Sequence, residues 1–89
     1  MIRNSLEWAS VESSLRHQAN TKIDTHDNRY QVCRMIDNIG VEITLLSKAE
    51  VLARRGSAGH ASELLQKINE DIELVEEFIL VAVLMGLYA

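Results

Sequence analysis

The sequence predicts an all-α protein that forms a single small domain over residues 1–89. Apolar residues recur at alternating three- and four-residue steps in two long stretches, which places them along one side of an α-helix. The chain has no proline, only four glycines and only four aromatic residues, whereas strand-rich chains use more aromatic and turn residues. These observations favour helices throughout.

The first helix is expected over about residues 5–19. Asn4 and Glu7 resemble a capping box, in which the two side chains satisfy amides of the first helical turn. The apolar side of this helix consists of Trp8, Val11, Leu15 and Ala19. Because a helix of about fifteen residues is marginal in water unless it is packed, we expect it to dock on the rest of the chain. Trp8 is the expected anchor, and an exposed contact for a partner is the alternative.

The second helix is expected over about residues 26–55, after a connector at residues 20–28 whose polar side chains favour turns and caps. Its apolar stripe consists of Val32, Ile36, Ile39, Ile43 and Leu46, and Val41, Leu45 and Leu52 add a flanking line. Gly40 costs about 1 kcal/mol relative to alanine in a helix interior, which indicates a close helix crossing. Gly56 suits the left-handed position past the last turn.

The third helix is expected over about residues 60–88. The loop before it is short, so this helix should return antiparallel to the second and form a long helical hairpin. Its main apolar stripe consists of Ala61, Leu65, Ile68, Ile72, Val75, Ile79 and Ala82, and a second line consists of Leu64, Leu74, Phe78, Val81, Met85 and Tyr88. No residue after Glu77 is charged. The helix therefore begins amphipathic and ends apolar on all sides.

The end of the third helix carries more apolar surface than one partner helix and a short first helix can cover. Leaving four such side chains in water forgoes about 6 to 10 kcal/mol. The hairpin is therefore expected to pair into a dimeric helix bundle, as a homodimer or with a helical partner. The expected interface consists of Leu74, Phe78, Leu80, Val81, Val83, Leu84, Met85, Leu87 and Tyr88.

The charges are consistent with pairing between the two long helices. The third helix has one lysine against six acidic residues, whereas residues 25–56 have five basic and four acidic residues. An antiparallel pairing of these helices would be mildly favourable, with each surface pair contributing less than about 1 kcal/mol.

Composition argues against several classes of function. The net charge is −4 and the basic residues are dispersed, so a nucleic-acid partner is not expected. Cys33 is the only cysteine, which suits a buried thiol in a reducing compartment, and no secretory signal is recognised, so a cytoplasmic location is expected. The uncharged segment after Glu77 has twelve residues, whereas a membrane span needs about twenty. A membrane span is therefore not expected.

The sequence offers no catalytic, cofactor-binding or metal-binding set. His17, His26 and His60 lie in three different segments, without the spacing to another histidine or cysteine that a metal site uses. The acidic residues between Glu70 and Glu77 are interpreted as a solvated helix face rather than as paired carboxylates for acid–base chemistry. No glycine-rich phosphate loop or activated nucleophile is present.

One stretch of the second helix is similar to the first helix of the small all-helical chorismate mutases. The similarity covers about twenty residues and consists of Arg34, Ile36, Asp37, Ile39, Leu45, Leu46 and Arg54. It shifts by one position after Gly40 and does not extend to that family's second and third helices, so no active-site residue is carried over. The resemblance implies a small helical enzyme as one alternative.

The function expected from the sequence is a non-catalytic protein–protein interaction module, such as a small regulator, adaptor or dedicated chaperone. It would act as an oligomer through its apolar last helix. Besides the enzyme, the remaining alternative is a peripheral membrane-surface protein that inserts this helix into the interface.

Overall fold

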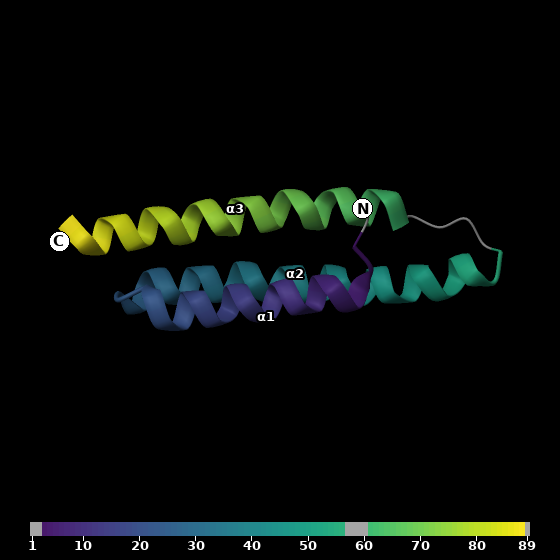
Figure 1. Ribbon diagram of the computed structural model, residues 1–89, viewed down its shortest axis with the longest axis horizontal. Coiled ribbons are helices and arrows are strands. Elements are labelled where there is room, and N and C mark those ends of the chain that lie inside the picture. The colour runs from purple at the N-terminus through teal and green to yellow at the C-terminus, as the bar shows by residue number, and fades with distance from the viewer. Residues whose placement is uncertain (1–2, 57–60, 89) are drawn as a thin grey trace.

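Three α-helices make up the fold (Figure 1). The computed structural model describes residues 3–56 and 61–88, and this part of the chain contains no strand. The helices are α1 at Ser5–Lys22, α2 at His26–Arg54 and α3 at Ala61–Tyr88. The predicted all-α class is therefore confirmed. α1 and α2 lie side by side, and α3 runs along the pair and extends beyond the α1–α2 turn at its C-terminal end (Figure 1).

α1 begins at the predicted residue but is longer than predicted. The Asn4 side chain accepts a hydrogen bond from the Glu7 amide at 2.9 Å, as the capping pattern indicates. The predicted end near residue 19 is wrong, because the helix continues to Lys22. Ala19 and Ile23 are both buried and lie four residues apart, so the polar residues between them must stay helical for both side chains to reach the core.

The N-terminus of α1 is also tied to the C-terminal half of α2. The Ser5 amide and hydroxyl donate hydrogen bonds to the two carboxylate oxygens of Glu50, at 2.9 and 2.6 Å. These two bonds to a charged acceptor fix where α1 begins along α2.

The connector between α1 and α2 is shorter than the predicted one and consists of residues 23–25. Thr25 occupies the N-cap position of α2 but makes no side-chain capping bond. Arg29 instead reaches back and donates two hydrogen bonds to the Ile23 carbonyl oxygen, at 2.8 and 3.2 Å. At the other end of α2, Gly56 has φ of +86°, the left-handed conformation predicted for it.

The core lies where the three helices meet, and it contains the predicted stripes. On α2, all five stripe residues from Val32 to Leu46 are buried. On α3, the stripe residues Ile68, Ile72, Val75, Ile79 and Ala82 are buried, and Leu65 is partly buried against them. Cys33 is only partly buried, so the expectation of a buried thiol is wrong.

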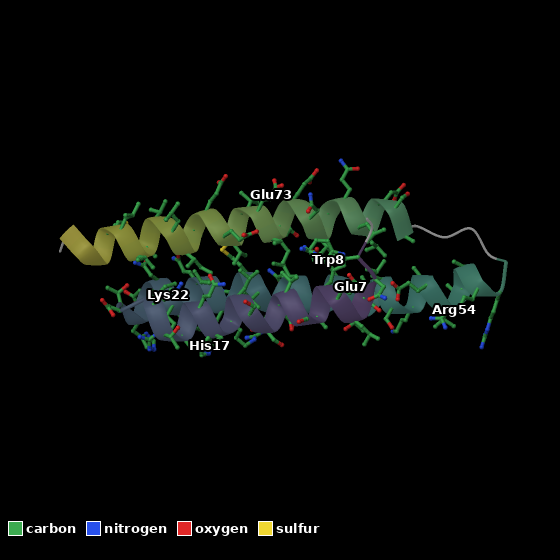
Figure 2. All side chains as sticks on the ribbon, in the orientation of Figure 1. Glu7, Trp8, His17, Lys22, Arg54 and Glu73 are labelled. Carbon is green, nitrogen blue, oxygen red and sulfur yellow. The ribbon has the colours of Figure 1, made fainter. Side chains whose placement is uncertain are left out.

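Trp8 lies in this core between α1 and α3 (Figure 2). Its side chain is 5% exposed, and the Arg3 guanidinium carbon lies 5.0 Å from the centre of its ring. The indole Nε1 is buried without a hydrogen-bond partner among the residues that the structure describes. Trp8 therefore supplies a large apolar contact area at the start of α1.

Candidate functional site

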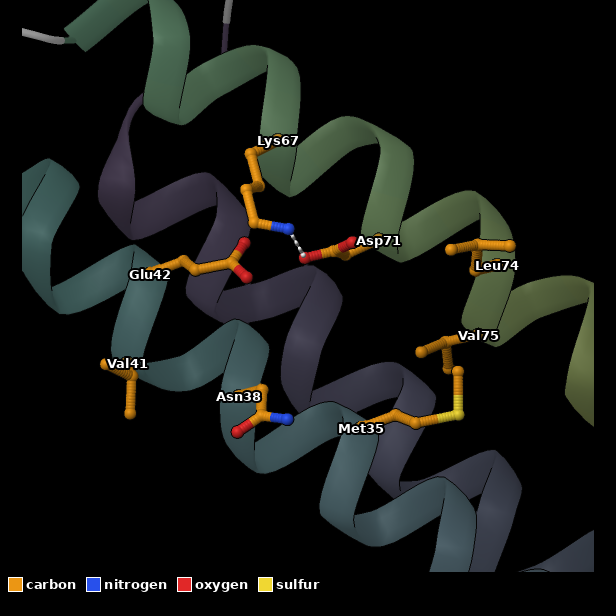
Figure 3. A pocket seen from close by; sticks show the side chains of 8 residues that line it. All are labelled: Met35, Asn38, Val41, Glu42, Lys67, Asp71, Leu74 and Val75. Carbon is orange, nitrogen blue, oxygen red and sulfur yellow. Dashed lines mark hydrogen bonds and ion pairs between the residues drawn. The ribbon is translucent and has the colours of Figure 1, made fainter.

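α1 covers one side of the α2–α3 pair and leaves the opposite side open. The polar contacts of α1 with α2 include those with Cys33, Asp37 and Glu50, which lie on the α1 side of α2. The opposite side forms a groove with a volume of about 480 Å³ (Figure 3). We call it the open groove; it is lined by Met35, Asn38, Val41 and Glu42 of α2 and by Lys67, Asp71, Leu74 and Val75 of α3.

A smaller hollow of about 270 Å³ continues the open groove toward the C-terminal end of α3. Met35 and Leu74 belong to both parts, and the hollow adds Glu77, Phe78 and Val81. The α3 wall therefore follows a regular four- and three-residue step that begins at Lys67 and reaches Val81. This spacing aligns the residues along one side of the helix, parallel to the buried stripe.

The walls of the open groove are largely apolar and exposed. Val41 is 61% exposed, Leu74 55% and Val81 54%. Leu45, one helical turn beyond Val41, and Met85, one turn beyond Val81, continue the two walls and are also exposed. An exposed apolar strip of this length on a small protein is typical of a protein-interaction surface.

Three charged side chains converge near the Lys67 end of the open groove (Figure 3). The Lys67 Nζ lies 3.3 Å from Asp71 Oδ2, and the Glu42 carboxylate reaches toward both from α2. Glu42 Oε2 is buried without a hydrogen-bond partner in the described part of the chain. The cluster thus holds two carboxyl groups against one ammonium group in a mainly apolar groove.

The cluster changes the proton affinity of its members. Burial, followed by the neighbouring Asp71 carboxyl, raises the pKa of Glu42 from 4.5 to about 7, against the lowering effect of Lys67. The ion pair with Asp71 raises the pKa of Lys67. Glu42 therefore exchanges a proton near neutral pH. Because burial is the main cause of the raised pKa, a partner that buried the cluster further would raise the pKa of Glu42 more.

The reactive groups of the open groove are the carboxyl groups of Glu42 and Asp71 and the ammonium group of Lys67, which can exchange protons and form polar contacts. None of the residues that line its two parts is a histidine, cysteine, serine or threonine. Within residues 3–56 and 61–88, no three metal-ligating side chains come together to hold an ion. His17 lies on the outer side of α1, away from α3 (Figure 2), and His26 is exposed at the start of α2.

The predicted interface residues do not all face the same way. Leu74, Phe78 and Val81 line the open groove, and Met85 continues that line. Leu80 and Leu84 are exposed, but helical periodicity places them on the outer side of α3. Val83 is partly buried against the core. The side chains of Leu87 and Tyr88 lie outside the described residues.

Sequence reasoning missed the α2 wall and the charged cluster. It identified Val41 and Leu45 only as a flanking line, and it assigned no role to Met35, Asn38 or Glu42. Val41, Leu45 and Leu52 follow a helical spacing parallel to the buried stripe. This spacing could have indicated that α2 has a second apolar side. Glu42 gave no such signal, because nothing local distinguishes a carboxylate that faces a groove from one in solvent.

The residues that carry the chorismate mutase resemblance do not converge on a site. The Arg34 guanidinium carbon lies 5.9 Å from the centre of the Tyr30 ring, and Arg34 lines a shallow hollow with Met35 and Asn38. Asp37 instead binds Arg16 of α1 at 3.0 Å. Arg54 lies at the C-terminal end of α2 (Figure 2).

No family model, curated protein or solved structure matches this chain. Among the described helices, none is both long enough and apolar enough to cross a membrane.

Proposed function

We propose that this protein is a non-catalytic interaction module that binds a second copy of itself through the open groove. The observation that carries the proposal is the continuous apolar strip on both walls, at Val41 and Leu45 on α2 and at Leu74, Val81 and Met85 on α3. Two hairpins joined along these strips would bury side chains that a single copy leaves in water.

The size of the open face suits a specific dimer. α3 has 28 residues, so at 1.5 Å per residue it is about 42 Å long. Two adjacent helices, each about 10 Å wide, present a face of about 800 Å² over that length. A standard protein interface buries about 800 Å² on each partner, so this face alone is large enough.

The free energy of burying the strip also suits association. Each of the five strip residues is roughly half exposed, and full burial of a large apolar side chain contributes about 1.5 to 3 kcal/mol. Burying the exposed halves on both copies would contribute about 8 to 15 kcal/mol. Association costs about 4 to 15 kcal/mol in lost freedom, so a dimer of moderate affinity is expected.

Leu74→Lys and Leu80→Lys form a matched pair for testing the proposal. The two leucines lie on the same helix and are 55% and 59% exposed, but only Leu74 lines the open groove. The wild-type chain should have the mass of a dimer by light scattering at micromolar concentrations. Leu74→Lys should shift the mass to that of a monomer, because the ammonium group would be buried in the interface. Leu80→Lys should leave the dimer intact.

Two outcomes would count against the proposal. A wild-type chain that is monomeric up to several hundred micromolar would exclude self-association. Equal loss of dimer in the two variants would place the interface on another side of α3. Loss of the helical far-UV circular dichroism in Leu74→Lys would indicate unfolding, so Val81→Lys serves as a second groove variant.

Roles as a regulator, adaptor or dedicated chaperone in the cytoplasm are consistent with such a module and belong to the same proposal. If the partner were a different protein, the wild-type chain alone would have the mass of a monomer by light scattering. Its mass would increase only when that second protein was added.

A further inference from the structure

The two walls of the open groove differ in charge. On α2, Arg34 lines a shallow hollow with Met35 and Asn38 of the groove wall. Lys48 lies seven residues after Val41, and this spacing places it on the same side of α2 as Val41. Neither cation makes an ion pair with a carboxylate among the described residues. On α3, the corresponding side carries Glu70 and Glu77. Glu70 accepts a hydrogen bond from Gln66, and Glu77 lines the hollow beside Met35. The α2 side therefore carries two cations beside Glu42, and the α3 side carries the carboxylates of Glu70, Asp71 and Glu77 beside Lys67. With every group ionised, the α2 side has a net charge of +1 (2 − 1) and the α3 side a net charge of −2 (1 − 3).

A two-fold dimer can join these faces in two ways. If the axis is perpendicular to the helices, α2 packs on the α2 of the partner, so cationic sides meet each other and acidic sides meet each other. If the axis is parallel to the helices, α2 packs antiparallel on the α3 of the partner, and each cationic side meets an acidic one. Like charges placed opposite each other disfavour the first arrangement, and opposite charges favour the second.

We infer that two copies pair about an axis parallel to the helices, with α2 of each on α3 of the other and Arg34 opposite the partner's Glu77. This inference rests on the proposed function, since it specifies how the open groove is filled.

The register follows from the geometry of a single copy. Rotation about an axis parallel to the helices does not move a residue along them. Within one copy, Met35 shares the smaller hollow with Leu74, Glu77 and Phe78, so the neighbouring Arg34 and Glu77 lie at a similar height. In the dimer, Arg34 therefore meets the partner's Glu77 at that height, and the contact occurs twice because the interface is symmetric.

Charge reversal tests this pairing. Arg34→Glu and Glu77→Arg should each weaken the dimer about tenfold, because each places like charges together at both symmetric contacts. The double variant Arg34→Glu/Glu77→Arg should return the dissociation constant to within about threefold of wild type. The measurement is sedimentation equilibrium at low salt, where exposed charges are least screened.

An equimolar mixture of the two single variants separates contacts between copies from contacts within one copy. In the mixed dimer, one symmetric contact pairs the native Arg34 with the native Glu77. The other contact pairs the glutamate at position 34 with the arginine at position 77. Both contacts are attractive, so dimers should reappear on mixing. A contact confined to one chain would not be restored by mixing. Glu73→Arg is the matched control, because Glu73 lies on the outer side of α3 (Figure 2) and its reversal should leave the dimer unchanged.

The possible results separate this inference from the proposed function. A wild-type dimer that neither single reversal weakens would overturn the pairing and leave self-association standing. Weakening without rescue, either in the double variant or on mixing, would also overturn the pairing. A monomeric wild-type chain would overturn both the pairing and the proposed self-association.

Discussion

Replacing Glu42 by glutamine removes an ionisable carboxyl group from the open groove while keeping the shape of the side chain. In the folded chain the pKa of Glu42 is raised from 4.5 to about 7, chiefly by burial. Between these two pH values the folded state binds more protons than the unfolded state, so the free energy of unfolding falls as the pH rises. Below about pH 4.5 this contribution is fully present, and above about pH 7 it is lost.

The size of the effect follows from the shift in pKa. One unit corresponds to 1.36 kcal/mol, so this shift would represent about 3 kcal/mol in a fully buried group. The Glu42 carboxylate is only partly buried, and solvent screening reduces the expected effect to about 1 kcal/mol. Glu42→Gln should therefore be about 1 kcal/mol more stable than wild type at pH 8 and nearly equal to it at pH 4.5.

Urea unfolding followed by circular dichroism at 222 nm, at pH 4.5, 6, 7 and 8, measures this difference. Ionisable groups present in both chains cancel when the two curves are subtracted. Glu73→Gln removes an exposed carboxylate from the outer side of the same bundle, and its effect should stay within about 0.5 kcal/mol at every pH. If the difference between Glu42→Gln and wild type does not change with pH, the reasoning about burial in the groove is refuted.

Two further substitutions test the packing by urea unfolding at pH 7. Ile68→Ala truncates a side chain of the α3 stripe that is 0% exposed, so it should lower the free energy of unfolding by about 2 to 5 kcal/mol; a loss under 1 kcal/mol would contradict the packing described. Gly40→Ala should raise the free energy of unfolding by about 0.5 to 1 kcal/mol, because alanine is the better helix former. Its Cβ would come within 2.5 Å of Glu12 Oε1, but a flexible side chain can move aside. A destabilised variant would show that Glu12 is held in place.

The fold could be predicted from the sequence to the extent that burial is periodic. The stripes on α2 and α3 repeat every three or four residues, and the residues of these two helices with no exposed surface, such as Val32 and Val75, belong to the stripes. The end of α1 could not be predicted in the same way. The polar residues between Ala19 and Ile23 favour a turn locally, and the need to bury Ile23 overrides that preference.

The candidate site was only half predictable, because a groove is made by two helices and each helix shows only its own pattern. The α3 wall contains leucine, phenylalanine and valine at regular spacing. The sequence alone therefore shows that this side of α3 is more apolar than a solvated helix face. The α2 wall mixes Met35 and Val41 with Asn38 and Glu42, so its pattern resembles an ordinary solvated face. Only the packing of α2 on α3 brings Glu42 beside Lys67 and Asp71.

The open groove combines two features that lower the stability of a single copy. It leaves Leu74 and Val81 about half exposed, and it places Glu42 Oε2 out of water without a hydrogen-bond partner in the described part of the chain. Trp8 Nε1 in the core is also buried without a partner in this part of the chain, so the groove differs from the core in combining such a group with exposed apolar side chains. Local conflicts of this kind are typical of functional sites. A partner that covers this face would remove the apolar exposure but would bury the Glu42 cluster further. Dimer formation and proton uptake by Glu42 should therefore favour each other, and both should weaken above neutral pH.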